Sequence, residues 1–428
     1  MDARARAPTR QHTRASRPHR GGDRLAALPR RFRRVSARQS RAALWRHCLS
    51  DLPTRKPDSG ASGCGAMGGH TLEGLASLVR NLGSACTLLR IADDDLLAGS
   101  QEGELICWSV ESGTERWRVE VDGPLSDLAI DGGRVYASAS ASLHAIDLDT
   151  GEILWSRGLE GASDYVQAWD GSVWAVSSVY EIEVSDYTES TVWRFDGMGE
   201  LQERWTVPER AWHFGLHEDG GVLLGLGRPR CGFLRIRSGE EPEHHQIEGD
   251  SPVTVGACGS SGRFLIGHSD GSVSTIVGSD AKTAGEGSSP VRAITGHGDD
   301  WIAGQESGQV VSSRGWTTTA AGSVDSLSMG PSTSEGEAVW VSSWKGDGVR
   351  ISVLDPDGGG SLLEFDHGHR TRHIQASAGK VVLGDSRGRI HLIEAGVLTR
   401  RVKESPVPAS DDENRERLME RLRQLRGS

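Results

Sequence analysis

Cysteine pairs, lysine and long apolar runs are all scarce in this chain of 428 residues. The six cysteines are scattered, with no adjacent pair and no Cys-x-x-Cys: Cys48, Cys64, Cys86, Cys107, Cys231 and Cys258. This spacing supports neither a zinc site nor a disulfide framework, so we expect reduced thiols. No run of about 18 apolar residues occurs, and the sequence therefore predicts no membrane span.

Lysine is the rarer basic residue, with only five lysines beside 43 arginines. Charge is divided unevenly, because residues 1–66 have a net charge of +12 and residues 67–428 a net charge of -23. An acidic, lysine-poor body is similar to the proteins of halophiles, whose excess carboxylates keep them soluble in salt. A halophilic archaeon is the expected source. Such a body repels phosphate, so we expect it to bind no nucleic acid.

Residues 1–66 have no apolar period and are rich in Arg, Pro, Ser and Gly. This composition predicts a disordered basic extension, and we expect Met67 to open the native chain. The RRFRR stretch at residues 30–34 is followed by polar and basic residues, whereas an export signal needs seven or more apolar ones. A cytoplasmic, monomeric protein is therefore expected.

Glycine, by contrast, is abundant: 56 of the 428 residues are glycine, about 13% against an average near 7%. After Met67 a short apolar stretch with a small residue in fourth place recurs eight times, about every 41 residues, a period typical of a four-stranded propeller blade. The copies are LLAGS from Leu96, VYASA from Val135, VWAVS from Val173, VLLGL from Val222, FLIGH from Phe264, WIAGQ from Trp301, VWVSS from Val339 and VVLGD from Val381.

The fourth position of this stretch is Gly or Ser in seven of the eight copies: Gly99, Ser138, Val176, Gly225, Gly267, Gly304, Ser342 and Gly384. A residue without bulk is needed where neighbouring sheets converge on an axis. The column therefore predicts an all-β fold, an eight-bladed β-propeller over residues 85–404. Seven blades stay the alternative if the first or last copy is shared in ring closure.

Two copies share a longer motif, CWSVESGTERW (Cys107–Trp117) and AIDLDTGEILW (Ala145–Trp155), and a looser copy ends at Trp205. This motif resembles the repeat of the PQQ-like, quinoprotein-type propellers, and Gly-His pairs at Gly296-His297 and Gly368-His369 resemble WD40 repeats. The resemblance covers residues 86–404. It implies that Trp117, Trp155 and Trp205 dock between blades, braced by turns such as those at Gly113 and Gly151.

The same resemblance implies an alternative function, a quinoprotein-type oxidoreductase that binds PQQ beneath an adjacent Cys-Cys disulfide and beside calcium. The chain has no adjacent cysteines, so we expect no enzyme, no catalytic residues, no bound cofactor and no metal site. His367, His369 and His373 have ligand spacing, but we favour a structural role in a loop between blades. The carboxylates at residues 93–95 and 299–300 are interpreted as turn formers.

Recognition of a protein partner is the favoured function, as a non-catalytic scaffold. The third copy has the longest interval because of an insertion, SVYEIEVSDYTES (Ser178–Ser190). Tyr and Trp in exposed loops bury much area at little entropic cost and make good interface anchors. The candidate partner-binding residues are Tyr165, Tyr180, Tyr187, Trp212 and Trp344.

The two ends carry helical patterns. Apolar residues from Leu72 to Leu82 form one stripe before Gly83, which predicts a short helix within residues 67–84. Residues 405–428 are expected to form a linker and an amphipathic helix, which begins at a Ser410/Glu413 capping box.

Overall fold

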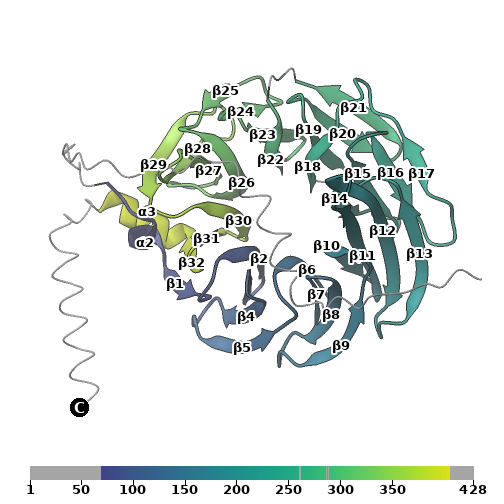
Figure 1. Ribbon diagram of the computed structural model, residues 1–428. Helices are drawn as coiled ribbons and strands as arrows, with labels where there is room; N and C mark the ends of the chain where they lie inside the picture. The colour runs from purple at the N-terminus through teal and green to yellow at the C-terminus, as the bar shows by residue number, and fades with distance from the viewer. Residues whose placement is uncertain (1–68, 260–261, 286, 288, 405–428) are drawn as a thin grey trace, which may run out of the picture. The chain divides into compact units, whose positions relative to one another are not determined.

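Each of the eight repeats folds as a four-stranded antiparallel sheet, and the sheets follow one another around a ring (Figure 1). The computed structural model describes residues 69–259, 262–285, 287 and 289–404. These residues form an eight-bladed β-propeller with only two short helices, which confirms the predicted fold class with eight blades rather than the alternative of seven. Within the same residues, no helix is long and apolar enough to cross a membrane.

Blades 1 to 4 are built from consecutive strands. They are β2 (Cys86–Ala92), β3 (Asp95–Ser100), β4 (Glu104–Ser109), β5 (Glu115–Glu120); β6 (Leu125–Asp131), β7 (Arg134–Ala139), β8 (Ser142–Asp147), β9 (Ile153–Gly158); β10 (Ala162–Trp169), β11 (Ser172–Glu181), β12 (Asp186–Asp196), β13 (Leu201–Val207); β14 (Ala211–Leu216), β15 (Val222–Leu226), β16 (Phe233–Ile236) and β17 (Glu243–His245).

Blades 5 to 8 continue the series, and the last blade takes its fourth strand from the beginning of the described chain. They are β18 (Val253–Cys258), β19 (Phe264–His268), β20 (Val273–Val277), β21 (Asp280–Ala284); β22 (Val291–His297), β23 (Asp300–Gln305), β24 (Gln309–Ser312), β25 (Thr317–Thr319); β26 (Ser323–Pro331), β27 (Glu337–Trp344), β28 (Val349–Leu354), β29 (Ser361–His367); β30 (Thr371–Ser377), β31 (Lys380–Asp385), β32 (Arg389–Glu394) and β1 (Leu78–Asn81).

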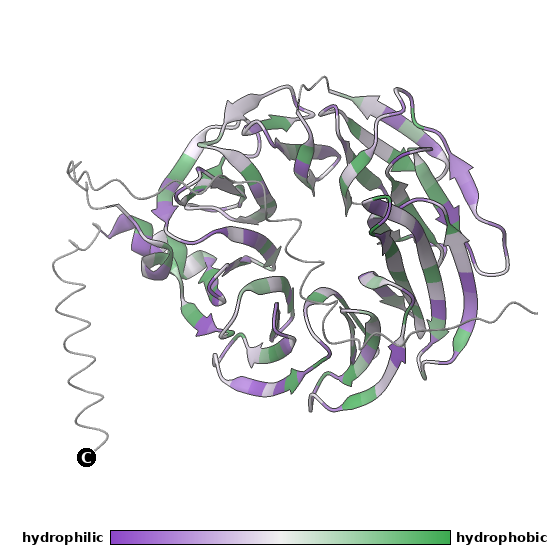
Figure 2. Ribbon diagram, viewed as in Figure 1, coloured by the Kyte–Doolittle hydropathy of each residue, from purple (hydrophilic) through white to green (hydrophobic). Residues whose placement is uncertain are grey.

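The order of the strands gives the ring two different faces. Each blade runs as an antiparallel meander from its first to its fourth strand. The second-to-third connections and the links between blades therefore share one face, here called the upper face. The other turns lie on the lower face. Apolar residues are concentrated in the inner and middle strands, such as β3, whereas outer strands such as β5 and β17 are largely hydrophilic (Figure 2).

The small residues of the repeat lie where one blade meets the next. A Cβ added to Gly99 would stand 3.0 Å from Cβ of Leu125, the first residue of the next blade. At Gly267 it would stand 2.6 Å from Val291 Cβ, and at Gly304 it would stand 2.9 Å from Val324 Cβ. Contacts below 3.0 Å are not tolerated by real side chains, so the column allows the inner strands to approach.

The exception in the column is compensated by its neighbour. Val176 occupies the position in blade 3, and the facing strand β14 begins with Ala211, the smallest of the aliphatic side chains. Both residues are fully buried in one apolar cluster. In blade 7 the column residue is Ser342, whose hydroxyl donates a hydrogen bond of 2.6 Å to the Thr371 carbonyl of blade 8.

Every first strand carries a β-bulge just after its start. The register shifts between Cys86 and Leu88 in blade 1, and at the matching place in the other seven blades. The extra residue is free to reach the next blade. Thr254 Oγ1, for example, lies 3.1 Å from Gly267 O of its own blade and 2.7 Å from Val291 O of blade 6.

Tryptophans of the fourth strands connect neighbouring blades at the periphery. The indole of Trp117 donates a 2.6 Å hydrogen bond to Leu148 O, and a Cβ on Gly151 would lie 2.8 Å from its ring. Trp155 donates to Gly197 O at 3.1 Å in the same manner. Trp316, which was not among the predicted docking residues, donates to Pro356 O at 3.0 Å.

Trp205 does not occupy the equivalent docking place. After the bulge in β13, Glu203 pairs with Arg194 and takes that place, accepting hydrogen bonds from Ser238 Oγ and Gly239 N of blade 4. Trp205 lies two residues further along and stacks on Trp174, with ring centroids 5.6 Å apart. The extra length of β12 and β13 shifts the tryptophan away from the turn.

The ring closes through the beginning of the described chain. Strand β1 pairs with β32 and supplies the fourth strand of blade 8. Arg80 Nε then donates a 2.8 Å hydrogen bond to Gly113 O, so Gly113 receives an arginine from blade 8 rather than a tryptophan. The helix predicted within residues 67–84 is limited to α2 (Leu72–Leu75), because residues 78–81 alternate as a half-buried strand.

A second short helix, α3 (Ala395–Lys403), follows β32 and packs on α2. Arg401 Nη1 donates to Gly74 O at 3.0 Å, which connects the two ends of the described chain. The predicted basic extension at residues 1–66 and the predicted C-terminal helix at residues 405–428 lie outside the described residues.

We predict that Gly304→Ala destabilises the propeller by about 1–3 kcal/mol, because the new methyl group overlaps Val324 of the next blade. Gly158→Ala is the matched control, since a Cβ there meets nothing within 4 Å. Urea unfolding followed by tryptophan fluorescence measures both. Adding Val324→Ala to the Gly304 variant should restore part of the loss, and no restoration would contradict close packing as the cause.

A second prediction concerns how the ring closure between α2 and β32 contributes to stability at low pH. Glu73 in α2 lies 3.5 Å from His391 Nε2 and 3.1 Å from Arg389 Nη1. The His391 contact is the main cause that lowers the pKa of Glu73 to about 2. A lowered pKa stabilises the fold above the usual carboxyl pKa, and this contribution disappears as pH falls from about 4.5 towards 2. Glu73→Gln should therefore lower Tm at pH 7 and flatten its decline below pH 5.

Candidate functional site

Strands β11 and β12, of 10 and 11 residues, form the longest second-to-third hairpin of the described residues. The two strands stay paired to Glu181 and Asp186, with a register shift after Val179. At the tip, Ile182 is 73% exposed and Val184 is 59% exposed. Two branched apolar side chains thus stand on the upper face without burial, between Glu181 and Asp186. Exposed apolar groups rimmed by charge are typical of interaction sites.

The base of this hairpin is held by stacked rings. Tyr180 and Tyr187 meet edge to face, with centroids 5.1 Å apart. The guanidinium carbon of Arg210, which precedes the first strand of blade 4, lies 3.7 Å from the centroid of Tyr187 and 4.6 Å from that of Trp212. Cation–π contacts of this kind fix the arginine between two flat surfaces. Trp212 remains 40% exposed.

An ion pair beneath the rings connects blades 3 and 4. Arg210 Nη2 lies 3.2 Å from Asp164 Oδ1, at the bulge of β10. Asp164 also accepts a hydrogen bond from Ser178 Oγ. Burial raises the pKa of Asp164, and Arg210 opposes that rise. The carboxylate depends on the arginine for its charge, so the hairpin base and the ion pair form one unit.

The structure brings three of the five predicted partner-binding residues together: Tyr180, Tyr187 and Trp212. Tyr165 is adjacent in sequence to Asp164, but its ring packs inward against Phe214, with centroids 6.4 Å apart. Burial raises the pKa of its hydroxyl. Trp344 belongs to a separate cluster in blades 7 and 8. Whether these residues contact a partner stays a prediction.

Blades 7 and 8 repeat the same arrangement with other residues. Asp325, at the bulge of β26, accepts two hydrogen bonds of 2.7 Å from Arg370, which precedes β30. The guanidinium carbon of Arg370 lies 5.2 Å from the centroid of Trp344. The upper face therefore carries two Asp–Arg–aromatic units separated by four blades.

The three histidines considered as metal ligands have structural contacts. His367 Nε2 lies 3.0 Å from Asp385 Oδ2, and both side chains are buried. His369 contacts the His367 ring edge to face, while burial lowers the pKa of His373 to about 4. Among the described residues, no group of three His, Cys, Asp or Glu side chains could hold a metal ion.

The remaining sequence candidates also serve the framework. Asp94 accepts from Ser109 Oγ and Glu111 N, and Asp300 pairs with Arg314 at 2.7 Å, so both belong to braced turns. The four cysteines in the described part of the chain are free. Burial raises the pKa of Cys107 to about 12, which keeps this thiol protonated and unsuited to nucleophilic chemistry.

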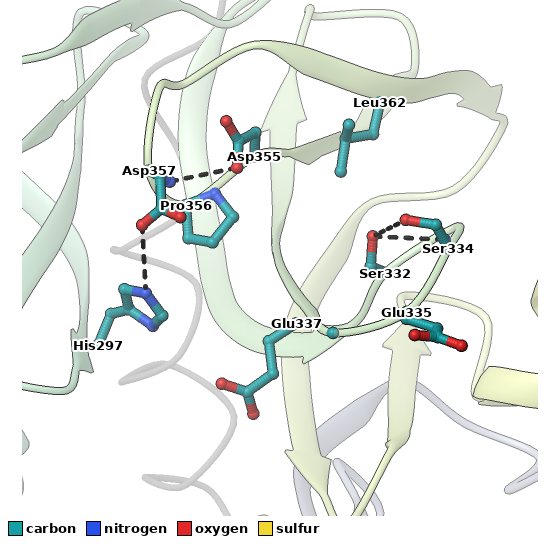
Figure 3. Close-up of a pocket in the computed structure, with 10 residues that line it drawn as sticks. His297, Ser332, Ser334, Glu335, Glu337, Asp355, Pro356, Asp357 and Leu362 are labelled. Carbon is teal, nitrogen blue, oxygen red and sulfur yellow. Dashed lines mark hydrogen bonds and ion pairs between the residues drawn. The ribbon is translucent and has the colours of Figure 1, made fainter.

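A hollow of about 360 Å³ opens on the lower face between blades 6 and 7 (Figure 3). Acidic side chains dominate its lining: Glu335, Glu337, Asp355 and Asp357. His297 faces this group, 3.9 Å from Asp357 Oδ1. A quinone cofactor of the PQQ type is itself a tricarboxylate, and a lining of carboxylates repels it. The residues of this hollow do not fit that cofactor.

The repeat with its docked tryptophans matches a known family. The family model described as outer membrane protein assembly factor BamB, of the PQQ_2 type, matches residues 33–257, more than half of the chain. The chain belongs to this family. No curated protein matches it in sequence. The BamB-type repeat thus confirms the resemblance to PQQ-like propellers.

Solved structures agree with a BamB-type propeller in fold. The computationally designed Ika8 protein is 17% identical, with a TM-score of 0.60, over 73% of this chain and 97% of that one. BamB from Moraxella catarrhalis is 14% identical, with a TM-score of 0.57, over 74% and 98%. Sqt1 from Saccharomyces cerevisiae is 11% identical, with a TM-score of 0.60, over 75% and 98%. At these identities the likeness concerns the fold alone.

The sequence prediction missed the two arginines that organise the upper face of this BamB-family chain. Arg210 and Arg370 each stand directly before the first strand of a blade, and Asp164 and Asp325 each stand at the bulge of the blade before. Aligning the copies on the start of the first strand, rather than on the second, would have placed each arginine opposite its aspartate.

We predict that Arg210→Met lowers the free energy of unfolding by about 2 kcal/mol, because Asp164 is left buried without its counter-charge. Asp164→Asn combined with Arg210→Met should cost less than the sum of the single changes. A double-mutant cycle from urea unfolding measures the coupling. Additive losses would show that the ion pair does not support the hairpin base.

Proposed function

We propose that this propeller is a non-catalytic scaffold that binds a protein partner through the tip and base of the β11–β12 hairpin. The observation that carries the proposal is the exposure of Ile182 and Val184 on a hairpin braced by Tyr187, Arg210 and Trp212. A braced tip loses little entropy when it binds.

Two further facts support a protein partner over a small molecule. The family description, an outer membrane protein assembly factor, names a role in protein assembly. The hollow between blades 6 and 7 is acidic and open, whereas small-molecule pockets are mostly apolar with a few polar groups. The acidic rim of the tip, Glu181, Glu183 and Asp186, favours an apolar partner surface bordered by basic residues.

The proposal includes a cytoplasmic location. It is supported by the four free cysteines of the described residues, since reducing compartments keep thiols unpaired, and it departs from the outer-membrane setting that the family description names. Cell fractionation with an antibody against the chain tests this part separately.

The double change Ile182→Ser and Val184→Ser tests the platform. We expect it to leave Tm unchanged, because both side chains are exposed, and to reduce retention of the partner at least tenfold. Met198→Ser is the matched control: Met198 is 67% exposed but lies in a third-to-fourth turn on the lower face. Affinity purification from cells of the source organism, quantified by mass spectrometry, compares the variants. Equal retention of the partner by the unchanged chain, the double variant and the Met198→Ser control would overturn the proposal.

A further inference from the structure

The hairpin of blade 3 extends beyond both of its neighbouring strands. Strand β10 pairs with β11 only as far as Ser178, and β13 pairs with β12 only as far as Ser190. Residues 181–186 at the end of the hairpin are all exposed. The tip therefore stands clear of its own sheet on the upper face, where a second molecule can reach it.

The tip presents two apolar side chains among unpaired acids. Ile182 is 73% exposed and Val184 is 59% exposed. Within the part of the chain that the structure describes, neither Glu181 nor Glu183 has a basic partner. A ligand of the tip therefore needs apolar side chains interspersed with cations, because the first match the branched side chains and the second match the carboxylates.

The chain itself contains a segment of this composition, outside the described residues. Residues 417–428 read RLMERLRQLRGS, with four apolar residues and with four arginines against one acid. The net charge of this segment is +3, whereas residues 67–428 as a whole have a net charge of -23. The spacing of Leu418, Leu422 and Leu425 predicts one apolar stripe on a helix. Its composition complements that of the tip.

The described chain ends on the face opposite the tip. Strand β32 is the third strand of blade 8 and ends on the lower face, where α3 follows it and Arg401 donates to Gly74 O (Figure 1). From its lower end to the tip, β12 alone spans about 36 Å, at about 3.3 Å for each of its 11 residues. Fully extended, residues 405–416 reach about 40 Å. Little length is left to pass from blade 8 to blade 3, so the basic segment does not reach the tip of its own chain.

We propose that residues 417–428 of a second copy of this chain bind the hairpin tip, with apolar side chains against Ile182 and Val184 and arginines beside Glu181 and Glu183. The inference rests on the proposed function in using the same tip, and it names a competitor for the partner. Each copy offers a tip on its upper face and a segment that follows its lower face, so copies add head to tail. Self-association thus regulates how many tips are open to the partner.

Sedimentation velocity of the full chain over a hundredfold range of concentration tests the inference. We expect association that increases with concentration. Ile182→Ser with Val184→Ser removes the apolar part of the tip, and Leu418→Ser with Leu422→Ser removes the stripe of the segment. Each double variant should associate at least tenfold more weakly, because few residues carry most of the energy of such a contact.

The two double variants are then mixed. The copy with the altered tip still supplies a segment, and the copy with the altered segment still supplies a tip. The mixture should therefore form a dimer that does not grow further, although each variant alone stays monomeric. A folding defect in either variant would not be repaired by mixing, so this result separates a lost contact from a lost fold.

Matched acids on the two faces provide the control. Glu181→Gln with Glu183→Gln should weaken association. Glu335→Gln with Glu337→Gln makes the same charge change at two exposed acids of the lower hollow and should associate as the unchanged chain does. Loss of association in this second pair would place the basic segment in the hollow instead of on the tip.

Three results are incompatible with the inference: a full chain that stays monomeric at every concentration, a mixture of the two double variants that forms no dimer, or loss of association in Glu335→Gln with Glu337→Gln. The proposed function fails separately. A monomeric chain that retains the partner through its tip contradicts the inference alone, whereas a chain that associates through its tip and retains no partner, even with Leu418→Ser and Leu422→Ser, contradicts the proposed function alone.

Discussion

Near the axis of this propeller, neighbouring blades approach until a single methyl group has no room. A Cβ added to Gly99 in β3, Gly267 in β19 or Gly304 in β23 would stand 2.6–3.0 Å from the Cβ of a residue at the start of the following blade. Close packing of this kind leaves little freedom, because a shift of one inner strand displaces the next. The β-bulges of the first strands lie at this close contact, and the extra residue of a bulge can hydrogen-bond to the next blade, as Thr254 does. Upper-face residues therefore act between blades rather than within one.

The periphery is joined differently, and unevenly. Tryptophans connect blades 1 to 2, 2 to 3 and 6 to 7, while an arginine connects blade 8 to blade 1 and a glutamate connects blade 3 to blade 4. A glycine lies beneath each tryptophan ring, at Gly151, Gly199 and Gly359, and another, Gly113, lies beneath Arg80. Repeats that share a core can diverge at the edge, because each outer contact involves only two blades. This divergence makes the outer rim of the lower face asymmetric, whereas the upper face is made asymmetric by the long β11–β12 hairpin.

The sequence predicted the propeller because a recurring small residue has one strong explanation, close approach at an axis. It also placed Tyr180, Tyr187 and Trp212 on one face, since connection order fixes that face. The helix expected within residues 67–84 is shorter than the apolar stripe that predicted it, because residues 78–81 of that stripe pair with β32 as a half-buried strand. Arg210 and Asp164 were missed because their pairing spans 46 residues and two blades, a separation that no local pattern reveals.

The pairing of β1 with β32 has a consequence for synthesis. During translation the first described strand emerges more than 300 residues before its partner, so it waits unpaired while seven blades are completed. An exposed edge of this kind invites aggregation. Once the last blade has folded, the pairing of β1 with β32 and the hydrogen bond from Arg401 to Gly74 join the two ends of the described chain. The ring can open at this point only if these contacts break. Detachment of either end of the described chain therefore opens the ring, and we expect it to be coupled to unfolding of the whole propeller.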